Sequence, residues 1–217
     1  KKLLENNGEK ENWFLHVNMW DPHTPYDTPK EFGNPFKNDP TEEWVTEELI
    51  KNQRSSFGPH SAREVPGYDD DLGDKYTMGV GSINNVADAK EQIDAYDTGI
   101  NYADFYLNKV FEDLKKLNIW DDTAIIISAD HGENQGELNV WGDHQTADHI
   151  TNRVPLIIRW PGITDNNKGN TVDNKFYNLD LTSTISQIVS SSQPERWDGI
   201  NFTENLKNSQ SENGREF

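Results

Sequence analysis

The 217-residue chain contains no cysteine and only two methionines. It therefore has no disulfide, no thiolate metal ligand and no cysteine nucleophile within these residues. It also lacks a run of about 18 apolar residues, which a transmembrane helix needs. No signal-peptide pattern opens the chain. We interpret residues 1–7 as the tail of a helix, and the chain as one that starts in mid-protein.

Basic residues are scarce, with 20 Lys and Arg against 38 Asp and Glu, so the formal net charge is −18. Nucleic acid and anionic membranes need a basic surface, and we expect neither as a partner. An anionic small molecule stays possible, because a divalent ion and a few histidines reverse the local field. The aromatic residues, 11% of the chain, indicate a folded protein despite an apolar fraction of only 33%.

Hydrophobic periodicity predicts an alternation of strands and helices. We expect strands over residues 13–19, 124–127 and 153–160, with a further one over 171–176. We expect helices over 40–52, capped by Thr41, and over 86–117 and 179–191. The helix over 86–117, a short turn and the strand over 124–127 make half of a βαβ unit, as in α/β proteins. Residues 27–85 carry many Pro and Gly and form a long irregular insertion, in which residues 69–71 (Asp-Asp-Asp) read as a solvated loop.

The most informative segment is TAIIISADHG, from Thr123 to Gly132. A short apolar strand ends in Asp130 and His131, and the carboxyl ends of strands are where chemistry collects in open α/β sheets. We expect Gly132 to let the backbone turn away from the pair. A carboxylate and an imidazole at a strand end indicate a metal or reacting group. Alone, they are equally consistent with a helix cap and an exposed imidazole.

Several segments in order resemble the sulfatase family of the alkaline phosphatase superfamily. They are DPHTPY after the first strand, the long helix, IIISADHGE, WGDHQTADHITNRVPLIIRWPG, and NLDLTSTISQI followed by WDGINF. The resemblance spans roughly residues 13–201. It implies that residues 1–217 form the central and C-terminal part of a catalytic domain. The implied fold is an α/β sandwich with a mixed, mostly parallel sheet flanked by helices, here incomplete at its sheet edge and with exposed apolar surface.

The resemblance assigns Asp130 and His131 as metal ligands. It implies a divalent ion, with Ca²⁺ as the first expectation. Calcium prefers oxygen ligands, so the imidazole of His131 leaves Mn²⁺ and Zn²⁺ open.

Two further histidines match family positions. His23 corresponds to the catalytic histidine that faces the ester oxygen, where an imidazole can protonate a leaving alcohol. His144 stands where the family usually has a lysine, nine residues before Arg153, that contacts the sulfate oxygens. The alternative for His23 is a loop histidine bonded to the backbone, and for His144 a solvent-exposed one. We read His16 as buried in its strand, His149 as structural, Arg153 as an anchor of a strand, and His60 as without a supporting pattern.

The family's nucleophile is a formylglycine made from a Cys or Ser in Cys/Ser-x-Pro-x-Arg. The segment Ser56 to Arg63 does not fit that pattern, because Phe57 stands two residues before Pro59. We therefore expect the formylglycine upstream of Lys1 and the fragment alone to be inactive. The family context favours a periplasmic or extracellular location, which the sequence leaves unknown.

Three functions follow for the whole protein. The first is a metal-dependent sulfuric-ester hydrolase acting on a small-molecule or glycan sulfate, such as a carbohydrate or aryl sulfate. The second is a phosphodiester or phosphonate monoester hydrolase of the same superfamily, which the histidines at 131 and 144 favour. The third is a binding domain with a degenerate site, which His144 in place of lysine favours.

Overall fold

The computed structural model describes Leu4, Asn6 and residues 12–67, 76–77, 79–211 and 214–215. The expected loop at 69–71 lies outside these residues, as does most of the expected helical tail. Two compact units are present. Unit 1 comprises residues 1–119 and 131–153, and unit 2 comprises residues 120–130 and 154–217.

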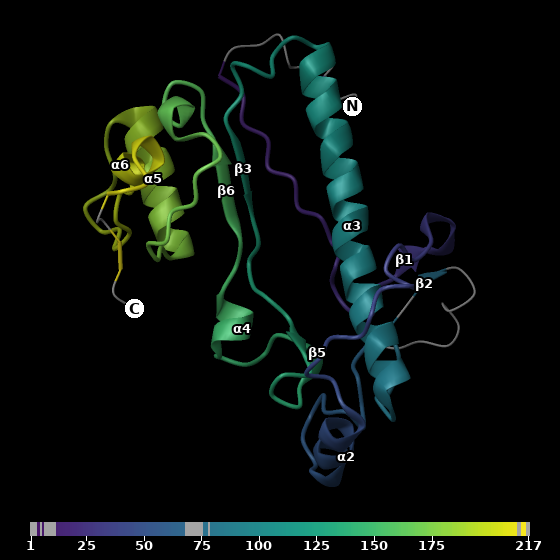
Figure 1. Ribbon diagram of the computed structural model, residues 1–217. Coiled ribbons are helices and arrows are strands. Elements are labelled where there is room, and N and C mark those ends of the chain that lie inside the picture. Colours follow the sequence, from purple (N-terminus) through teal and green to yellow (C-terminus); the bar gives the residue numbers. More distant parts are fainter. Residues whose placement is uncertain are drawn as a thin grey trace. The chain divides into compact units, whose positions relative to one another are not determined.

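The longest element of unit 1 is helix α3, Val86–Lys116, which Figure 1 shows as one continuous helix. Its start is fixed by Asn85, whose side chain accepts a hydrogen bond from the N–H of Asp88 at 3.0 Å. These bounds confirm the predicted helix. A 3.6-residue periodicity predicts an apolar stripe that includes Ile100 and Tyr106, but both side chains are more than 40% exposed. The buried residues of α3 are mostly small or polar, with one leucine among them: Ala89, Gln92, Asp94, Ala95, Thr98, Gly99 and Leu114.

The core of unit 1 lies against the first turns of α3. It joins Ala89 of α3 to Ile50 of helix α2 (Glu47–Ser55) and to Trp141 of strand β5 (Trp141–Asp143). Helix α2 starts later than predicted, because Thr46 and not Thr41 accepts the capping hydrogen bond from Leu49 N–H, at 3.1 Å. Part of the core thus comes from within the irregular residues 27–85.

Short elements complete unit 1. Strand β1 (Thr28–Pro29) pairs antiparallel with β2 (Tyr76–Thr77), and β4 (Asn134–Gln135) pairs antiparallel with β5. A 3₁₀ turn, η1, covers Lys30–Phe32. Helix α4 (His149–Asn152) is capped by Asp148, whose carboxylate accepts from the N–H groups of Ile150 and Thr151.

The predicted strand over residues 13–19 is not formed. Phe14 is 85% exposed, Val17 is 52% exposed, and His16 is exposed and not buried as expected. Apolar residues alone do not make a strand, because each backbone N–H and C=O of a strand needs a partner in a neighbouring strand. The described residues supply no such neighbour here.

Unit 2 contains the strand that ends near Asp130. Strand β3 (Ile125–Ser128) pairs with β6 (Leu156–Arg159), and Figure 1 shows the two side by side. The pairing is antiparallel, with Ile126 opposite Ile158. The mostly parallel pairing that the family resemblance implies is therefore not seen in these two strands. The described residues form three two-stranded antiparallel sheets, and the larger mixed sheet stays a prediction.

The rest of unit 2 is mostly helical. Helix α5 (Asn178–Ser190) confirms the predicted helix to within a residue. The 3₁₀ turn η2 (Asp165–Asn167) precedes it, and helix α6 (Thr203–Lys207) follows it. The expected strand over residues 171–176 is reduced to a single bridge between Lys175 and Arg215.

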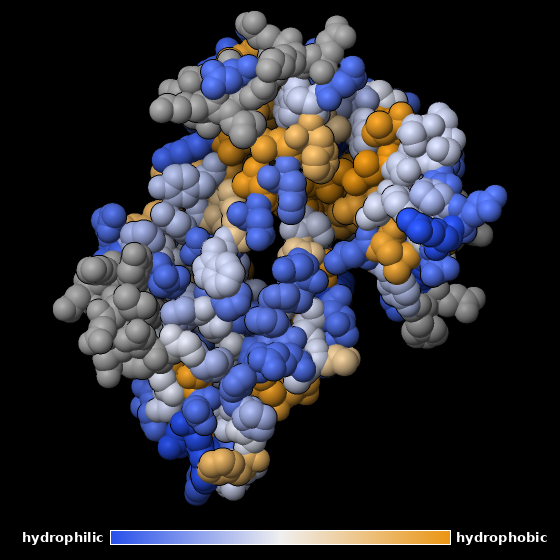
Figure 2. Space-filling model, turned by 180° about the vertical axis from the view of Figure 1, so that it is seen from behind, coloured by the Kyte–Doolittle hydropathy of each residue, from blue (hydrophilic) through white to orange (hydrophobic). Residues whose placement is uncertain are grey.

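Several large apolar side chains are exposed, among them Phe57 in a loop, Ile157 of β6 and Val189 of α5, and the incomplete sheet edge stays a prediction. Figure 2 shows apolar surface between the polar regions of one face. Among the described residues no helix combines the length and hydropathy that crossing a membrane requires.

Candidate active site

The loop that carries His23 is fixed against helix α3 by a glycine. A Cβ atom at Gly99 would lie 2.8 Å from Pro22 Cβ and 3.1 Å from Pro22 Cα. Only glycine permits this approach, since the proline ring cannot rotate away. The contact sets the position of the residue that follows Pro22 in the chain, which is His23.

The His23 ring is held on two sides. Its Nδ1 lies 2.7 Å from the carbonyl oxygen of Thr24, so Nδ1–H is the donor. Its face stacks on the indole of Trp20, with ring centroids 4.2 Å apart. The bond to Thr24 selects the tautomer in which Nε2 is the basic nitrogen.

His131 is oriented in the same way. Its Nδ1 lies 2.8 Å from the carbonyl oxygen of Gly132, which again makes Nδ1 the donor. Gly132 is required here by a close approach and not by the sharp turn we expected. A side chain at 132 would collide with the carbonyl oxygen of Ile150, and Gly132 N–H donates to Thr151 O at 2.7 Å.

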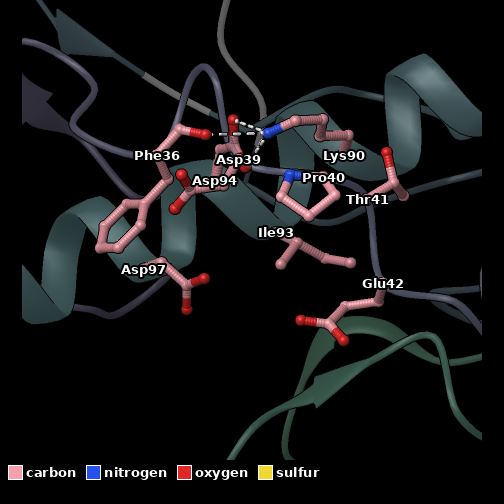
Figure 3. A pocket seen from close by; sticks show the side chains of 9 residues that line it. All are labelled: Phe36, Asp39, Pro40, Thr41, Glu42, Lys90, Ile93, Asp94 and Asp97. Carbon is pink, nitrogen blue, oxygen red and sulfur yellow. Dashed lines mark hydrogen bonds and ion pairs between the residues drawn. The ribbon is translucent and has the colours of Figure 1, made fainter.

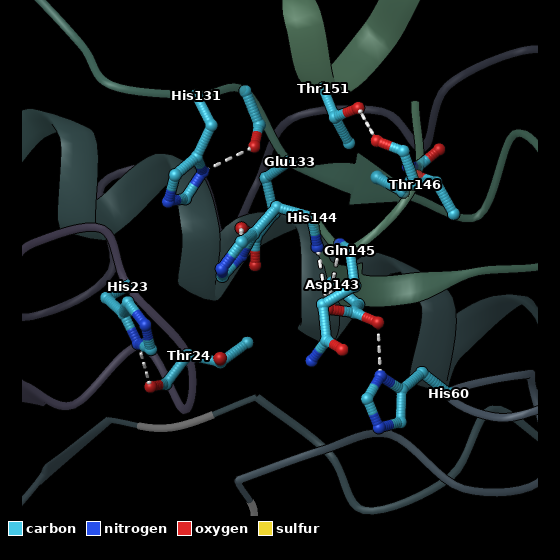
Figure 4. A network of polar contacts seen from close by, with 12 residues as sticks. His23, Thr24, His60, His131, Glu133, Asp143, His144, Gln145, Thr146 and Thr151 are labelled. Carbon is cyan, nitrogen blue, oxygen red and sulfur yellow. Dashed lines mark hydrogen bonds and ion pairs between the residues drawn. The ribbon is translucent and has the colours of Figure 1, made fainter. Parts of the chain in front are cut away.

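The centre of the site is a buried carboxylate, that of Glu133, which is only 8% exposed. Its Oε1 accepts a hydrogen bond from the hydroxyl of Tyr26 at 2.9 Å, and its Oε2 lies 3.1 Å from Nδ1 of His144. Gln135 Nε2 donates to the same tyrosine hydroxyl at 2.7 Å. Figure 4 shows His144 over Glu133. Because Glu133 accepts from Nδ1, the basic nitrogen of His144 is also Nε2.

Tyr26 stays a neutral donor in this network. Burial, and then the nearby carboxylate of Glu133, raise the pKa of Tyr26 well above its usual range. The residue is fully buried and has a positive φ of 65°. A neutral phenol that donates to Glu133 satisfies one carboxylate oxygen without a cation.

Three histidines therefore meet around Glu133. The rings of His131 and His144 are stacked with centroids 3.7 Å apart, and the edge of His23 faces His144 at 5.6 Å. One ligand atom each from His131, Glu133 and His144 lies within 4.8 Å of the others. Two imidazoles and a carboxylate form a donor set for a divalent metal ion. In protonated form, the same imidazoles provide positive charge for an anionic substrate.

A second histidine–carboxylate pair supports the loop of His144. Nδ1 of His60 makes a short contact with Oδ2 of Asp143, and Oδ1 of Asp143 accepts from the backbone N–H of His144 at 2.7 Å. Burial acts to raise the pKa of Asp143. The hydrogen bonds from His60 and His144 outweigh it, and the pKa lies below its usual range. The pair holds the start of the His144 loop in place.

The sequence-predicted residues fall into two groups. The structure brings His23, His131 and His144 together within unit 1. Asp130 is an exposed residue of unit 2, two positions after β3. His149 and Arg153 are exposed at the two ends of α4, and their structural roles stay predictions.

Sequence reasoning missed Glu133, Tyr26 and His60. Glu133 had a readable signal, since it lies two residues after His131 in the same motif. Tyr26 lies in the DPHTPY segment but was not assigned a role. His60 had none, because its partner Asp143 is 83 positions away.

An acidic pocket elsewhere in unit 1 has a structural explanation. It is lined by Asp39, Glu42, Asp94 and Asp97, among others (Figure 3). Lys90 Nζ lies 2.6 and 2.7 Å from the two oxygens of Asp94 and donates to Phe36 O at 3.0 Å. Burial, then the charges of Asp94 and Glu42, raise the pKa of Asp97. The carboxylate of Asp94 is thus paired with Lys90 inside the pocket. The described carboxylates there do not form a metal-ligand set.

Comparison with known proteins places the sequence of this chain in a family. The model of the family described as Sulfatase matches residues 1–191. The chain is 27% identical over 202 residues to a choline-sulfatase of Rhizobium meliloti (strain 1021), a match that covers 91% of this chain and 36% of that protein. The chain thus spans little more than a third of that relative's length.

Solved structures share the fold. A phosphonate monoester hydrolase from Silicibacter pomeroyi superposes with a TM-score of 0.73 at 23% identity, covering 99% of this chain and 42% of the other. A protein solved in complex with its substrate D-glucosamine-2-N,6-O-disulfate gives a TM-score of 0.54 at 17% identity, covering 95% and 44%. At these identities the likeness establishes the α/β fold and not the substrate.

Proposed function

The chain belongs to the sulfatase family, and from this premise we propose that the protein containing it hydrolyses sulfuric esters. The observation that carries the proposal is the meeting of His23, His131 and His144 around the buried carboxylate of Glu133. A decayed site has no physical need to keep three imidazoles that are each held by a hydrogen bond at Nδ1. This argues against a purely binding role.

In this proposal His23 is the general acid. Its Nδ1–H stays bonded to Thr24 O, and the imidazolium form gives its Nε2 proton to the bridging ester oxygen as the S–O bond breaks, which leaves a neutral imidazole. The alcohol leaves neutral, which removes the cost of expelling an alkoxide. Glu133 positions His144 through Nδ1, so that Nε2–H of protonated His144 donates to a sulfate oxygen. His144 would then do the work of the lysine that it replaces.

A divalent metal ion completes the proposed site. Asp130 and His131 would hold it, as the family resemblance implies, and it would supply positive charge to the sulfate oxygens. The residues fit such an ion, because the hydrogen bond to Gly132 leaves His131 with Nε2 as its basic nitrogen. The imidazole of His131 is a nitrogen ligand, which favours Mn²⁺ or Zn²⁺ over the Ca²⁺ expected from the family.

The nucleophile of the proposal is a formylglycine outside these 217 residues, which contain no cysteine. Its hydrate would attack sulfur while His23 protonates the leaving oxygen on the opposite side. The substrate class that we propose is a carbohydrate or aryl sulfate. A sugar sulfate is the substrate of one protein of similar fold.

A phosphonate monoester or phosphodiester hydrolase is the second candidate. The observation that favours it is His144 in the lysine position, together with the nitrogen-rich donor set. The two candidates differ in the geometry and charge of the group attacked and not in the leaving group, which His23 would protonate in both.

The test uses the full-length protein. Turnover of 4-nitrophenyl sulfate is compared with that of 4-nitrophenyl phenylphosphonate after removal of metal with a chelator and re-addition of Ca²⁺, Mn²⁺ or Zn²⁺ in turn. We expect the sulfate to have the higher kcat/KM and activity to depend on an added ion. A higher kcat/KM for the phosphonate would contradict the proposal in favour of the second candidate, and turnover of neither ester would contradict both.

A further inference from the structure

His60 and Asp143 form a histidine–carboxylate pair to which the proposed chemistry gives no role. The side chain of His60 is 30% exposed, that of Asp143 is 10% exposed, and Nδ1 of the histidine contacts Oδ2 of the carboxylate. Both residues belong to unit 1, as does His144, the residue that follows Asp143. Figure 4 shows the His60 ring directed at Asp143. The pair can therefore act on the candidate active site through His144.

The backbone of His60 is fixed to strand β5 independently of its ring. Its carbonyl oxygen accepts a hydrogen bond from the N–H of Trp141 at 2.8 Å, two residues before Asp143. Its φ is 55°, a left-handed conformation that is uncommon for residues other than glycine. Because glycine would adopt this φ without strain, what histidine adds at position 60 is the side chain that reaches Asp143.

Asp143 divides its two oxygens between the His60 ring and the His144 loop. Its Oδ1 accepts from the backbone N–H of His144 at 2.7 Å and from that of Gln145 at 3.3 Å. Rotation of a carboxylate about the Cβ–Cγ bond is soft, so these acceptors alone do not hold it in one orientation. The contact of Oδ2 with the His60 ring opposes this rotation and keeps Oδ1 on the His144 backbone.

His144 is thus held at two points by two different carboxylates. Asp143 accepts from its backbone N–H, and Oε2 of Glu133 lies 3.1 Å from its ring Nδ1. The first contact sets where the residue lies, and the second sets how the ring is turned. Together they fix the direction of Nε2, the atom that donates to a sulfate oxygen in the proposed function.

We propose that His60 is a positioning residue for sulfate binding, which acts through Asp143 to fix the backbone of His144. This inference rests on the proposed function, because it uses the contact of His144 with sulfate. His60 itself does not touch the substrate and acts only on geometry. Geometry matters at this point, because a displacement of about 1 Å at a reacting site can cost roughly 100-fold in rate.

The test compares two substitutions of His60 in the full-length protein. His60→Gly removes the ring and adopts a positive φ without strain. His60→Asn also tolerates a positive φ, and its side-chain NH₂ keeps a donor for Asp143 close to the position of Nδ1. Asn118→Gly is the control for the added backbone freedom, since it makes the same change at a second residue of unit 1 with a φ of 55°, outside the site.

Two quantities are measured: the Kd of inorganic sulfate by isothermal titration calorimetry, and kcat and KM for 4-nitrophenyl sulfate. We expect His60→Gly to raise both Kd and KM about tenfold or more. His60→Asn should restore both values close to those of the wild type, and Asn118→Gly should change neither. A merely structural role would lower the melting temperature and the active fraction, and would leave the Kd of the folded protein unchanged.

Two results would overturn the inference. One is wild-type affinity for sulfate in His60→Gly, and the other is an equal loss of affinity in His60→Asn and His60→Gly. Because sulfate binding needs no turnover, the proposed function can fail separately. A wild-type protein that binds sulfate but hydrolyses no sulfate ester would contradict the proposed function, and the variants would still decide the role of His60. A wild-type protein that does not bind sulfate would overturn both.

Discussion

Glu133 and Asp180 are both buried carboxylates, but their hydrogen-bond partners differ in kind. Asp180 is fully buried and is held by the guanidinium of Arg215, with Nη2 to Oδ1 at 2.6 Å. It also accepts from the backbone N–H groups of Tyr177 and Ile200. The described partners of Glu133 are a neutral phenol and an imidazole.

The difference separates a structural carboxylate from a functional one. The positive charge of arginine is permanent, so the Asp180 pair is neutralised at every physiological pH and fixes the first turn of α5. Glu133 instead orients His144, whose basic nitrogen faces away from it. A buried carboxylate that orients a histidine among other histidines indicates chemistry. One that caps a helix and binds an arginine indicates folding.

The largest effect should come from removing the proposed general acid, His23. His23→Ala in the full-length protein should lower kcat/KM for an alkyl or sugar sulfate by about 10²–10⁴-fold. The loss should be much smaller for 4-nitrophenyl sulfate, whose leaving group needs no proton. Steady-state kinetics on both substrates measures the difference. Equal losses on the two would show that His23 has no role as an acid.

The complementary variant in unit 2 should affect stability and not chemistry. Asp180→Ala leaves Arg215 and two backbone N–H groups without their acceptor, at a cost of about 3 kcal/mol in the free energy of unfolding. Arg215 is 23% exposed, which keeps the cost at the lower end. Thermal and denaturant unfolding measure it, and kcat of the folded protein should not change. Glu204→Ala, which removes an exposed pair with Lys207, is the control. Stability losses of equal size in the two variants would refute the structural role of Asp180.

Removing the contact that positions His23 should have an intermediate effect on both stability and kcat/KM. Gly99→Ala forces Pro22 away from α3 and should cost about 1–3 kcal/mol of stability, with a loss of kcat/KM because the His23 loop moves. Gly58→Ala is the matched control, since no atom lies within 4 Å of a Cβ there. If Gly99→Ala kept wild-type activity and melting temperature, the loop would not depend on this contact.

The smallest expected effect is the pH dependence of stability that comes from Asp180. Burial acts to raise the pKa of Asp180, but the hydrogen bonds from Arg215 outweigh it and lower the pKa below 3.8. A carboxylate with a lowered pKa in the folded state stabilises the fold above its unfolded pKa and loses that contribution as pH falls through the folded value. Unfolding between pH 5 and 2 should therefore show a steeper loss of stability in the wild type than in Asp180→Asn. Parallel curves would contradict this.

The elements that could be predicted from sequence are those with local signals. Helix α3 has an Asn cap and a long pattern, and α5 was found to within a residue. The face that α3 buries could not be predicted, because Gly99 is buried by Pro22, a partner distant in sequence. The expected strand at 13–19 failed for the same reason, since pairing depends on a neighbour that the pattern does not show.

In the candidate site, too, the residues with local sequence signals were predicted and those defined by distant contacts were not. His23, His131 and His144 were identified from motifs, and the structure shows that they meet. The carboxylate of Glu133 was missed although it lies two residues after His131, because its contact with His144 and its hydrogen bond from Tyr26, 107 positions away, become visible only in the fold. The roles of Asp130 and of a metal ion stay predictions.

The most direct test of the account is the Glu133→Gln variant of the full-length protein. The substitution keeps the side-chain volume and an acceptor for Tyr26 but removes the charge that orients His144. We expect kcat/KM for sulfate-ester hydrolysis to fall about 10–100-fold, with a melting temperature close to that of the wild type. Full activity in Glu133→Gln would contradict the claim that Glu133 and His144 form the centre of the active site.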